Sequence, residues 1–297
     1  EKYILGEDKF PLDKNKMGIL YSLLDSVLNV DSDQFINNSK LKDGTSLFIR
    51  KGTTPHPNNS FINSLAGLKN ISGEELTKQI ISNITPELFL GLNNGDLVKM
   101  FSSEKQQNMD ATHRNIFLKW CNFYNKFYYS FTKQKNTTNI DNDNIENLDQ
   151  TKKKMLVSIF IAFENFKKYC GDPNIYKDAV LFQDLLSRKN EWFFKNGLNI
   201  DILEKKIIGS NRLYINCSTY NDLFEDNKSI CFLYKHKTFY EPIVIAVTKK
   251  EKYIPDFIYT FNEDKKKFTS DLLINRAFNL YYIAKNNCIQ ETDENLY

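Results

Sequence analysis

The chain has 297 residues, of which 41% are hydrophobic and 26% are charged, a composition typical of one large or two smaller folded domains. Its 40 Lys and Arg residues nearly balance its 37 Asp and Glu residues, so a net charge of +3 excludes an acidic scaffold and a protein that binds nucleic acid through bulk charge. No apolar run approaches the roughly 20 residues of a membrane-spanning helix, so we expect no membrane partner.

The first half of the chain carries mostly helical patterns. Helix signals are apolar residues at helical spacing, a capping box and a Thr-Pro helix start, and they predict helices over 15–28, from about 60, from 72, from 85 and over 110–131. A strand is predicted at 46–50. We therefore expect residues 1–132 to be a mainly helical N-terminal region that includes a Pro-His-Pro loop.

The second half changes from helical to strand patterns. Residues 133–151 are polar and rich in Asn and Asp, which predicts a flexible loop. Helices are predicted over 152–169 and 174–188, strands over 198–204, 212–217, 229–236, 240–248 and 256–261, and a closing helix over 271–285. The fold class expected is α+β: a helical N-terminal half, then an antiparallel β-meander of about five strands closed by a C-terminal helix, with 152–297 as the sheet domain.

A rigid loop before the second predicted helix is a candidate docking surface. Its two prolines fix their own φ and bias the preceding residues toward extended conformations, so His56 lies between two rigid positions. Rigidity lowers the cost of ordering a loop on binding. We expect His56, Asn58 and Asn59 to contact a protein or phosphate partner.

A second rigid feature is the sequence Tyr240-Glu241-Pro242. Proline within a strand indicates an edge strand or a bulge, because it cannot donate a hydrogen bond to a neighbouring strand. We therefore expect a partner to lie beside Tyr240 and Glu241.

No metal or cofactor site is expected. Cys217, Cys231 and His236 come nearest to a zinc-ligand spacing, but strand periodicity places Cys231 and His236 on opposite faces. Neither GxxxxGK[ST] nor GxGxxG before a helix is present. The five cysteines are odd in number, scattered and without a CxxC pair, which favours a reducing intracellular compartment.

One enzymatic alternative is a metal-dependent nuclease of the restriction-endonuclease type. Such enzymes place carboxylates from a strand on a divalent ion and a lysine near the attacking water. The strand segment Asp201-Ile-Leu-Glu204-Lys205-Lys206 offers this pattern, and Asp184 could supply the second carboxylate if Asp201 does not. The structural alternative is that Glu204 and Lys206 form the exposed end of a strand.

Clustered lysines in predicted turns are the candidate nucleic-acid contacts. They could share one edge of the sheet and follow a phosphate backbone, although lysines in turns also serve solubility and edge protection. These lysines are Lys235, Lys237, Lys249, Lys250, Lys252, Lys265, Lys266 and Lys267.

Three segments resemble a known family. They are 50–65 (Arg-Lys-Gly…Pro-Asn-Asn-Ser-Phe-Ile-Asn-Ser-Leu), 190–204 (Asn-Glu-Trp-Phe-Phe…Gly-Leu-Asn-Ile-Asp-Ile-Leu-Glu) and 233–243 (Leu-Tyr-Lys…Tyr-Glu-Pro-Ile). Together they resemble the large subunit of the early transcription factor of nucleocytoplasmic large DNA viruses.

The resemblance implies a non-enzymatic module of viral transcription initiation that binds nucleic acid or protein. Its implied partners are DNA, the viral RNA polymerase and a helicase-like ATPase subunit, and its implied locations are the viral factory in the host cytoplasm and the virion. A virion structural or interaction protein remains an alternative. Because the chain starts at Glu1 without Met, we expect it to be a segment of a longer protein.

Overall fold

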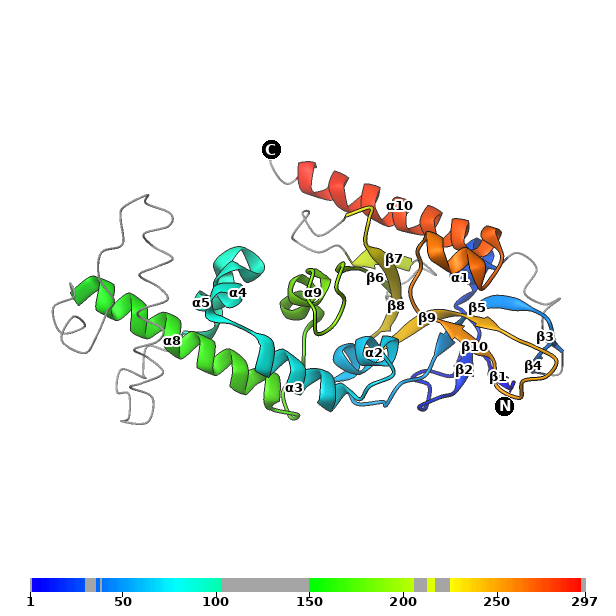
Figure 1. Cartoon of the computed structure of the whole chain (residues 1–297), viewed down its shortest axis with the longest axis horizontal. Coiled ribbons are helices and arrows are strands. Elements are labelled where there is room, and N and C mark those ends of the chain that lie inside the picture. The colour runs from blue at the N-terminus through cyan, green and yellow to red at the C-terminus, as the bar shows by residue number, and fades with distance from the viewer. Residues whose placement is uncertain are drawn as a thin grey trace. The chain divides into compact units, whose positions relative to one another are not determined.

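The computed structural model describes residues 2–29, 36–37, 39–102, 150–205, 213–216 and 225–294 (Figure 1). Contacts divide the chain into two compact units, Glu1–Thr77 with Pro173–Tyr297, and Lys78–Asp172. These limits differ from the composition-based ranges, and the predicted helix 110–131 and most of the predicted loop 133–151 lie outside the described residues.

The first unit is built around a mixed sheet of eight described strands in the order β1-β2-β5-β9-β8-β6-β7, with β10 also paired to β9. Its strands are β1 (Ile4–Leu5), β2 (Met17–Gly18), β5 (Ser46–Lys51), β6 (Leu198–Lys205), β7 (Leu213–Asn216), β8 (Ser229–His236), β9 (Phe239–Val247) and β10 (Asp256–Ile258). Two further short strands, β3 (Ile36–Asn37) and β4 (Lys40–Leu41), pair with each other.

The α+β class is confirmed, and each of the five strands predicted in the second half is present. The sheet is not an antiparallel meander, however. Strand β7 pairs with one edge of β6, and β8 pairs with the other edge and runs parallel to β6. Strand β5, from the first half of the chain, then extends the sheet by pairing with β9. The first helix is also shorter than predicted: α1 is Ser22–Leu28, because residues 17–18 form β2.

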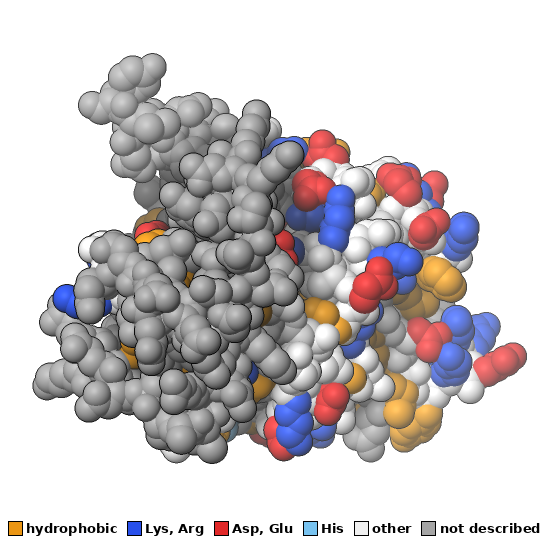
Figure 2. Space-filling model, turned by 60° about the vertical axis from the view of Figure 1, so that its left-hand side comes forward, with side chains coloured by type: hydrophobic (Ala, Val, Ile, Leu, Met, Phe, Trp, Pro, Cys, Tyr) orange, Lys and Arg blue, Asp and Glu red, His pale blue; other side chains and the backbone are white. Residues whose placement is uncertain are grey.

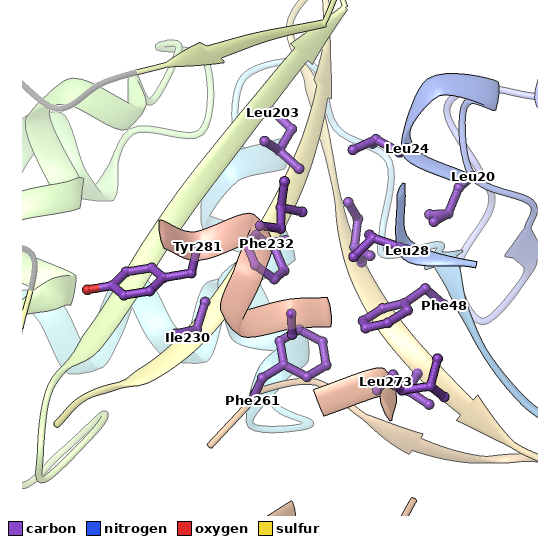
Figure 3. Packing of buried hydrophobic residues seen from close by; sticks show 14 of the residues in the cluster. Leu20, Leu24, Leu28, Phe48, Leu203, Ile230, Phe232, Phe261, Leu273 and Tyr281 are labelled. Atoms are coloured by element: carbon purple, nitrogen blue, oxygen red, sulfur yellow. The ribbon is translucent and has the colours of Figure 1, made fainter. Parts of the chain in front are cut away.

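One face of the sheet carries the larger apolar core (Figure 3). Helices α1 and α10 (Asp271–Glu294) cover this face. Leu24 and Leu28 of α1 pack with Phe48, and Phe232 and Phe261 stack with their ring centres 5.6 Å apart. Alternation along each strand supplies this core, because every second residue points to the same face.

The opposite face is covered near β9 by α2 (Ser60–Leu68) and near β6 by α9 (Ala179–Ser187). The Phe61 ring lies edge-on to Tyr240 at 5.3 Å, and the Gln183 amide donates to the Ile200 carbonyl at 2.8 Å. A smaller apolar cluster, which includes Leu47, lies between β5, β9 and the N-terminal strands. The predicted helix after the Pro-His-Pro loop is therefore confirmed as α2, which begins after Asn59.

Helix α3 (Gly73–Asn83) begins in the first unit and ends in the second. The predicted cap is present, since the Glu75 amide donates to the Ser72 hydroxyl at 3.0 Å. The second unit also contains α4 (Pro86–Gly91), the 3₁₀ turn η2 (Leu92–Gly95), α5 (Asp96–Phe101) and α8 (Gln150–Gly171). Phe89 packs on Phe163 and Phe166 of α8, which gives this unit an aromatic core of its own.

Candidate nucleic-acid interface

An open groove of about 780 Å³ lies where the N-terminal strand, β4 and the loop between β9 and β10 meet. Five lysines and two carboxylates line it, together with two tyrosines and one leucine. The lysines are Lys2, Lys40, Lys42, Lys250 and Lys252, and the carboxylates are Asp43 and Glu251. We call this feature the lysine groove.

Hydrogen bonds hold the walls of the lysine groove together. The Thr248 hydroxyl donates to the Lys42 carbonyl at 2.6 Å and so joins the β9–β10 loop to the turn after β4. The Lys2 ammonium forms an ion pair with Asp43 and donates to the Lys249 carbonyl at 3.1 Å. Three chain segments that are far apart in sequence are thus fixed around one opening.

The charge of the lysine groove is unevenly neutralised. Lys252 lies 2.7 Å from Asp256, a carboxylate that Lys249 also contacts at 2.9 Å. Hydrogen bonds from these two lysines lower the pKa of Asp256, so the carboxylate stays ionised between two cations. Within the described part of the chain, Lys42 and Lys250 form no ion pair. Two exposed ammonium groups are therefore available to an anion at this site.

Two aromatic rings accompany these cations. Tyr253 is 78% exposed, the highest value among the large hydrophobic side chains that the structure describes, and Tyr3 is 51% exposed. Tyr3 and Lys40 form an antiparallel bridge, and the Lys40 ammonium lies 4.4 Å from the centre of the Tyr3 ring. The lysine groove thus combines positive charge with exposed ring surface.

A second groove of about 650 Å³ lies on the other flank of the β9–β10 loop. Lys249, Lys265 and Lys267 line it beside a single carboxylate, Asp256. Its apolar lining includes Phe257, whose ring centre lies 4.1 Å from the Lys51 ammonium. Both grooves therefore carry more lysines than carboxylates, in contrast to the near-neutral chain.

Five of the eight predicted lysines therefore gather on the two flanks of the β9–β10 loop. The other three do not line either groove. Lys235 pairs with Glu204 at 3.3 Å, and Lys266 pairs with Glu263 at 2.6 Å. Lys237 lies in the β8–β9 turn, at the far end of the nine-residue β9, which is about 30 Å long. Figure 2 shows basic and acidic side chains interspersed over the described surface that it displays.

Sequence reasoning missed the lysine-groove residues Lys2, Tyr3, Lys40 and Lys42. They come from the N-terminal strand and the β4 turn, which local patterns gave no reason to place beside residues 250–253. The alternation of lysine with apolar residues in SKLKD, 39–43, is the one signal that indicated an exposed strand edge.

The Pro-His-Pro loop contacts the protein itself. The Asn58 carbonyl accepts from the Lys177 amide at 2.7 Å, and the Asn58 side chain donates to the Asn174 carbonyl at 2.9 Å. His56 accepts from the Asn58 amide at 3.3 Å through Nδ1, and the Asn59 side chain donates to Asn63 at 3.2 Å. Asn58 thus fastens the loop to the segment before α9, whereas the bonds of His56 and Asn59 lie within the loop and α2. A role of these residues in partner binding stays a prediction.

Tyr240 and Glu241 are not at a partner surface, and this corrects the prediction of an edge. Both are about 1% exposed, because β9 is a central strand between β5 and β8. Pairing of β9 with β5 stops at Ile243, directly beside Pro242. Beyond that point the Ser64 hydroxyl of α2 donates to the Tyr240 carbonyl at 2.7 Å. A helix thus supplies the hydrogen bond that a neighbouring strand would otherwise make, and the proline is tolerated.

The carboxylates of the nuclease hypothesis do not converge among the described residues. Asp184 is bound by Arg188 at 2.6 Å on α9, and Glu204 pairs with Lys235. Asp201 is 2% exposed in the core, and burial raises its pKa well above the ordinary value. Lys206 lies outside the described residues. No group of three potential ligands that could hold a metal ion occurs in the described ranges.

The described cysteines are buried. Cys170 and Cys231 do not form a disulfide, and burial raises the pKa of the Cys231 thiol well above its usual range. Cys288, in α10, is disulfide-bonded. The cellular compartment stays a prediction.

None of the helices in the described ranges is both long and apolar enough to cross a membrane. The chain matches no protein-family model, no curated protein and no solved structure. The features that bear on function are therefore the two grooves and the three segments that resemble the viral transcription factor subunit.

Proposed function

We propose that this protein is a non-enzymatic nucleic-acid-binding module and that the lysine groove is its contact surface. The observation that carries the proposal is the gathering of five lysines from three chain segments around one opening. Lysines bind phosphate groups as point charges, and displacement of condensed counterions supplies much of the affinity.

The second groove extends the same surface. Lys249 and Lys252 share one carboxylate, so the β9–β10 loop between the grooves keeps a net positive charge. A polyanion that crosses this loop would meet cations on both flanks. A small anionic metabolite would need only one of the grooves, so the two together favour a polymeric ligand.

The wider context follows from the sequence resemblance. We propose that the module acts in transcription initiation of a large DNA virus, together with the viral RNA polymerase and a helicase-like ATPase subunit. It would work in the host cytoplasm or in the virion. Co-purification of these partners with the tagged protein from infected cells tests this part of the proposal independently of nucleic-acid binding.

Removal of two unpaired lysines is expected to weaken nucleic-acid binding. The double variant Lys42→Ala/Lys250→Ala should lower affinity and should reduce the slope of log K against log salt by about 1.4 for a single strand or about 1.8 for a duplex. The slope changes because fewer counterions are released on binding when two phosphate contacts are lost. Fluorescence anisotropy with labelled oligonucleotides at several salt concentrations measures both quantities.

The matched control is Lys14→Ala/Lys195→Ala, which removes two exposed lysines outside both grooves. It has the same change in net charge and should keep the wild-type slope. Equal loss of binding in the two double variants would contradict a local site and would indicate attraction by net charge alone. Cleavage of the oligonucleotide in Mg²⁺ would contradict the non-enzymatic assignment.

A further inference from the structure

The two tyrosines of the lysine groove point to a more specific ligand. A binding surface for duplex DNA needs cations and hydrogen-bonding groups, because the protein meets phosphates and base edges while the base faces remain stacked on one another. Exposed aromatic rings serve a different purpose. They offer a flat surface on which an unpaired base can stack.

Tyr253 is the better placed of the two rings. It is 78% exposed in the β9–β10 loop, and no ring or cation contact involves it among the described residues. Tyr3 already carries the Lys40 ammonium 4.4 Å from its ring centre. A base can therefore use only the remaining face of Tyr3, whereas Tyr253 can receive a base directly.

The phosphate contacts lie beside this ring. Lys250 is three residues from Tyr253 in the same loop, and Lys42 lies on the wall that Thr248 joins to this loop. The groove volume of about 780 Å³ falls within the range of about 300–1,000 Å³ that is typical of ligand pockets. Such a space can hold a few nucleotides of a flexible strand.

We infer that the lysine groove binds single-stranded nucleic acid in preference to duplex, with an unpaired base stacked on Tyr253 and its phosphates on Lys42 and Lys250. This inference depends on the proposed function, since it names the substrate class of the same site. It adds a selectivity that the lysines alone would not produce.

The test compares Tyr253→Ala with Tyr253→Phe in binding to labelled oligothymidylate, to a duplex and to an abasic oligomer of equal length. Wild type should prefer oligothymidylate, and Tyr253→Ala should weaken that binding about tenfold, because one base loses its stacking partner. Tyr253→Phe keeps the ring and should bind like wild type. The abasic oligomer should bind equally to all three proteins.

A control for nonspecific loss is Tyr282→Ala, which removes an exposed tyrosine of α10 outside the lysine groove. It should leave all affinities unchanged. Salt-dependent binding with equal affinity for single strand and duplex, and with no effect of Tyr253→Ala, would overturn this inference and leave the proposed function intact. If no nucleic acid binds at all, both are overturned.

Discussion

Replacing Glu241 with leucine is expected to lower the free energy of unfolding by about 3–5 kcal/mol, because Arg50 would then carry a buried charge without a counterion. The side chains of Arg50 and Glu241 are 1% and 2% exposed, and their closest nitrogen and oxygen atoms lie 2.9 Å apart. Urea unfolding followed by circular dichroism measures the change.

The expected effect is large because the Arg50 guanidinium is fixed in place by several hydrogen bonds besides the ion pair. Arg50 Nε donates to the Ile19 carbonyl at 2.7 Å, and its Nη atoms donate to the Lys9 and Gly6 carbonyls at 3.1 Å. Glu241 in turn accepts from the Leu12 amide. The pair therefore fastens the N-terminal segment to the centre of the sheet. Loss of Glu241 should also loosen residues 6–19, which hydrogen exchange would detect.

A double variant tests whether the unpaired charge of Arg50 causes the loss of stability. Arg50→Met/Glu241→Leu removes both charges and should be more stable than Glu241→Leu alone, because no charge is left unpaired. The exposed pair Lys267–Asp264, with side chains 75% and 83% exposed, is the control. Asp264→Ala should change stability by less than about 1 kcal/mol. If Glu241→Leu has an equally small effect, Arg50 is not held by this carboxylate.

Much of this fold could be predicted because its signals are local. A run of β-branched and aromatic residues between polar turns located β8 at its observed ends, and the Thr85-Pro86 signal marked the start of α4. The parallel pairing of β6 with β8, and the pairing of β5 with β9, could not be predicted in this way. Both join segments whose contact depends on the path of the whole chain, and alternation is the same in parallel and antiparallel strands.

In the candidate site, too, local features could be predicted and long-range contacts could not. The lysines of the β9–β10 loop could be predicted because turn composition is local. The apposition of Tyr3 and Lys42 to that loop could not. Glu241 shows the opposite error: a charged residue beside a proline was interpreted as exposed, although its counterion, Arg50, is 191 residues away in the sequence. In the sequence, a buried charged residue cannot be distinguished from an exposed one unless its counterion is known.

Asp201→Asn is expected to change how stability depends on pH. Asp201 points to the same face of β6 as Leu203, which belongs to the larger apolar core, and is paired in register with Phe232. Its Oδ2 atom has no hydrogen-bond partner among the described residues. Burial therefore raises the pKa of this carboxyl well above its ordinary value of 3.8, so the folded protein keeps the proton when the unfolded chain has lost it.

The direction of the effect follows from this difference in proton binding. Below pH 3.8 Asp201 is protonated in both the folded and the unfolded protein, so it does not make stability depend on pH. From there up to the raised pKa, each pH unit lowers the free energy of unfolding by up to about 1.4 kcal/mol, because the folded state binds the extra proton. Asn cannot ionise, so the Asp201→Asn variant should gain stability over wild type as pH rises and should lose this advantage in acid.

Urea unfolding from about pH 4 to about pH 8 measures the difference in stability between wild type and Asp201→Asn. The control is Glu191→Gln, which replaces an exposed carboxylate. A difference between wild type and Asp201→Asn that stays constant over this range would show that the Asp201 carboxyl titrates alike in the folded and unfolded states.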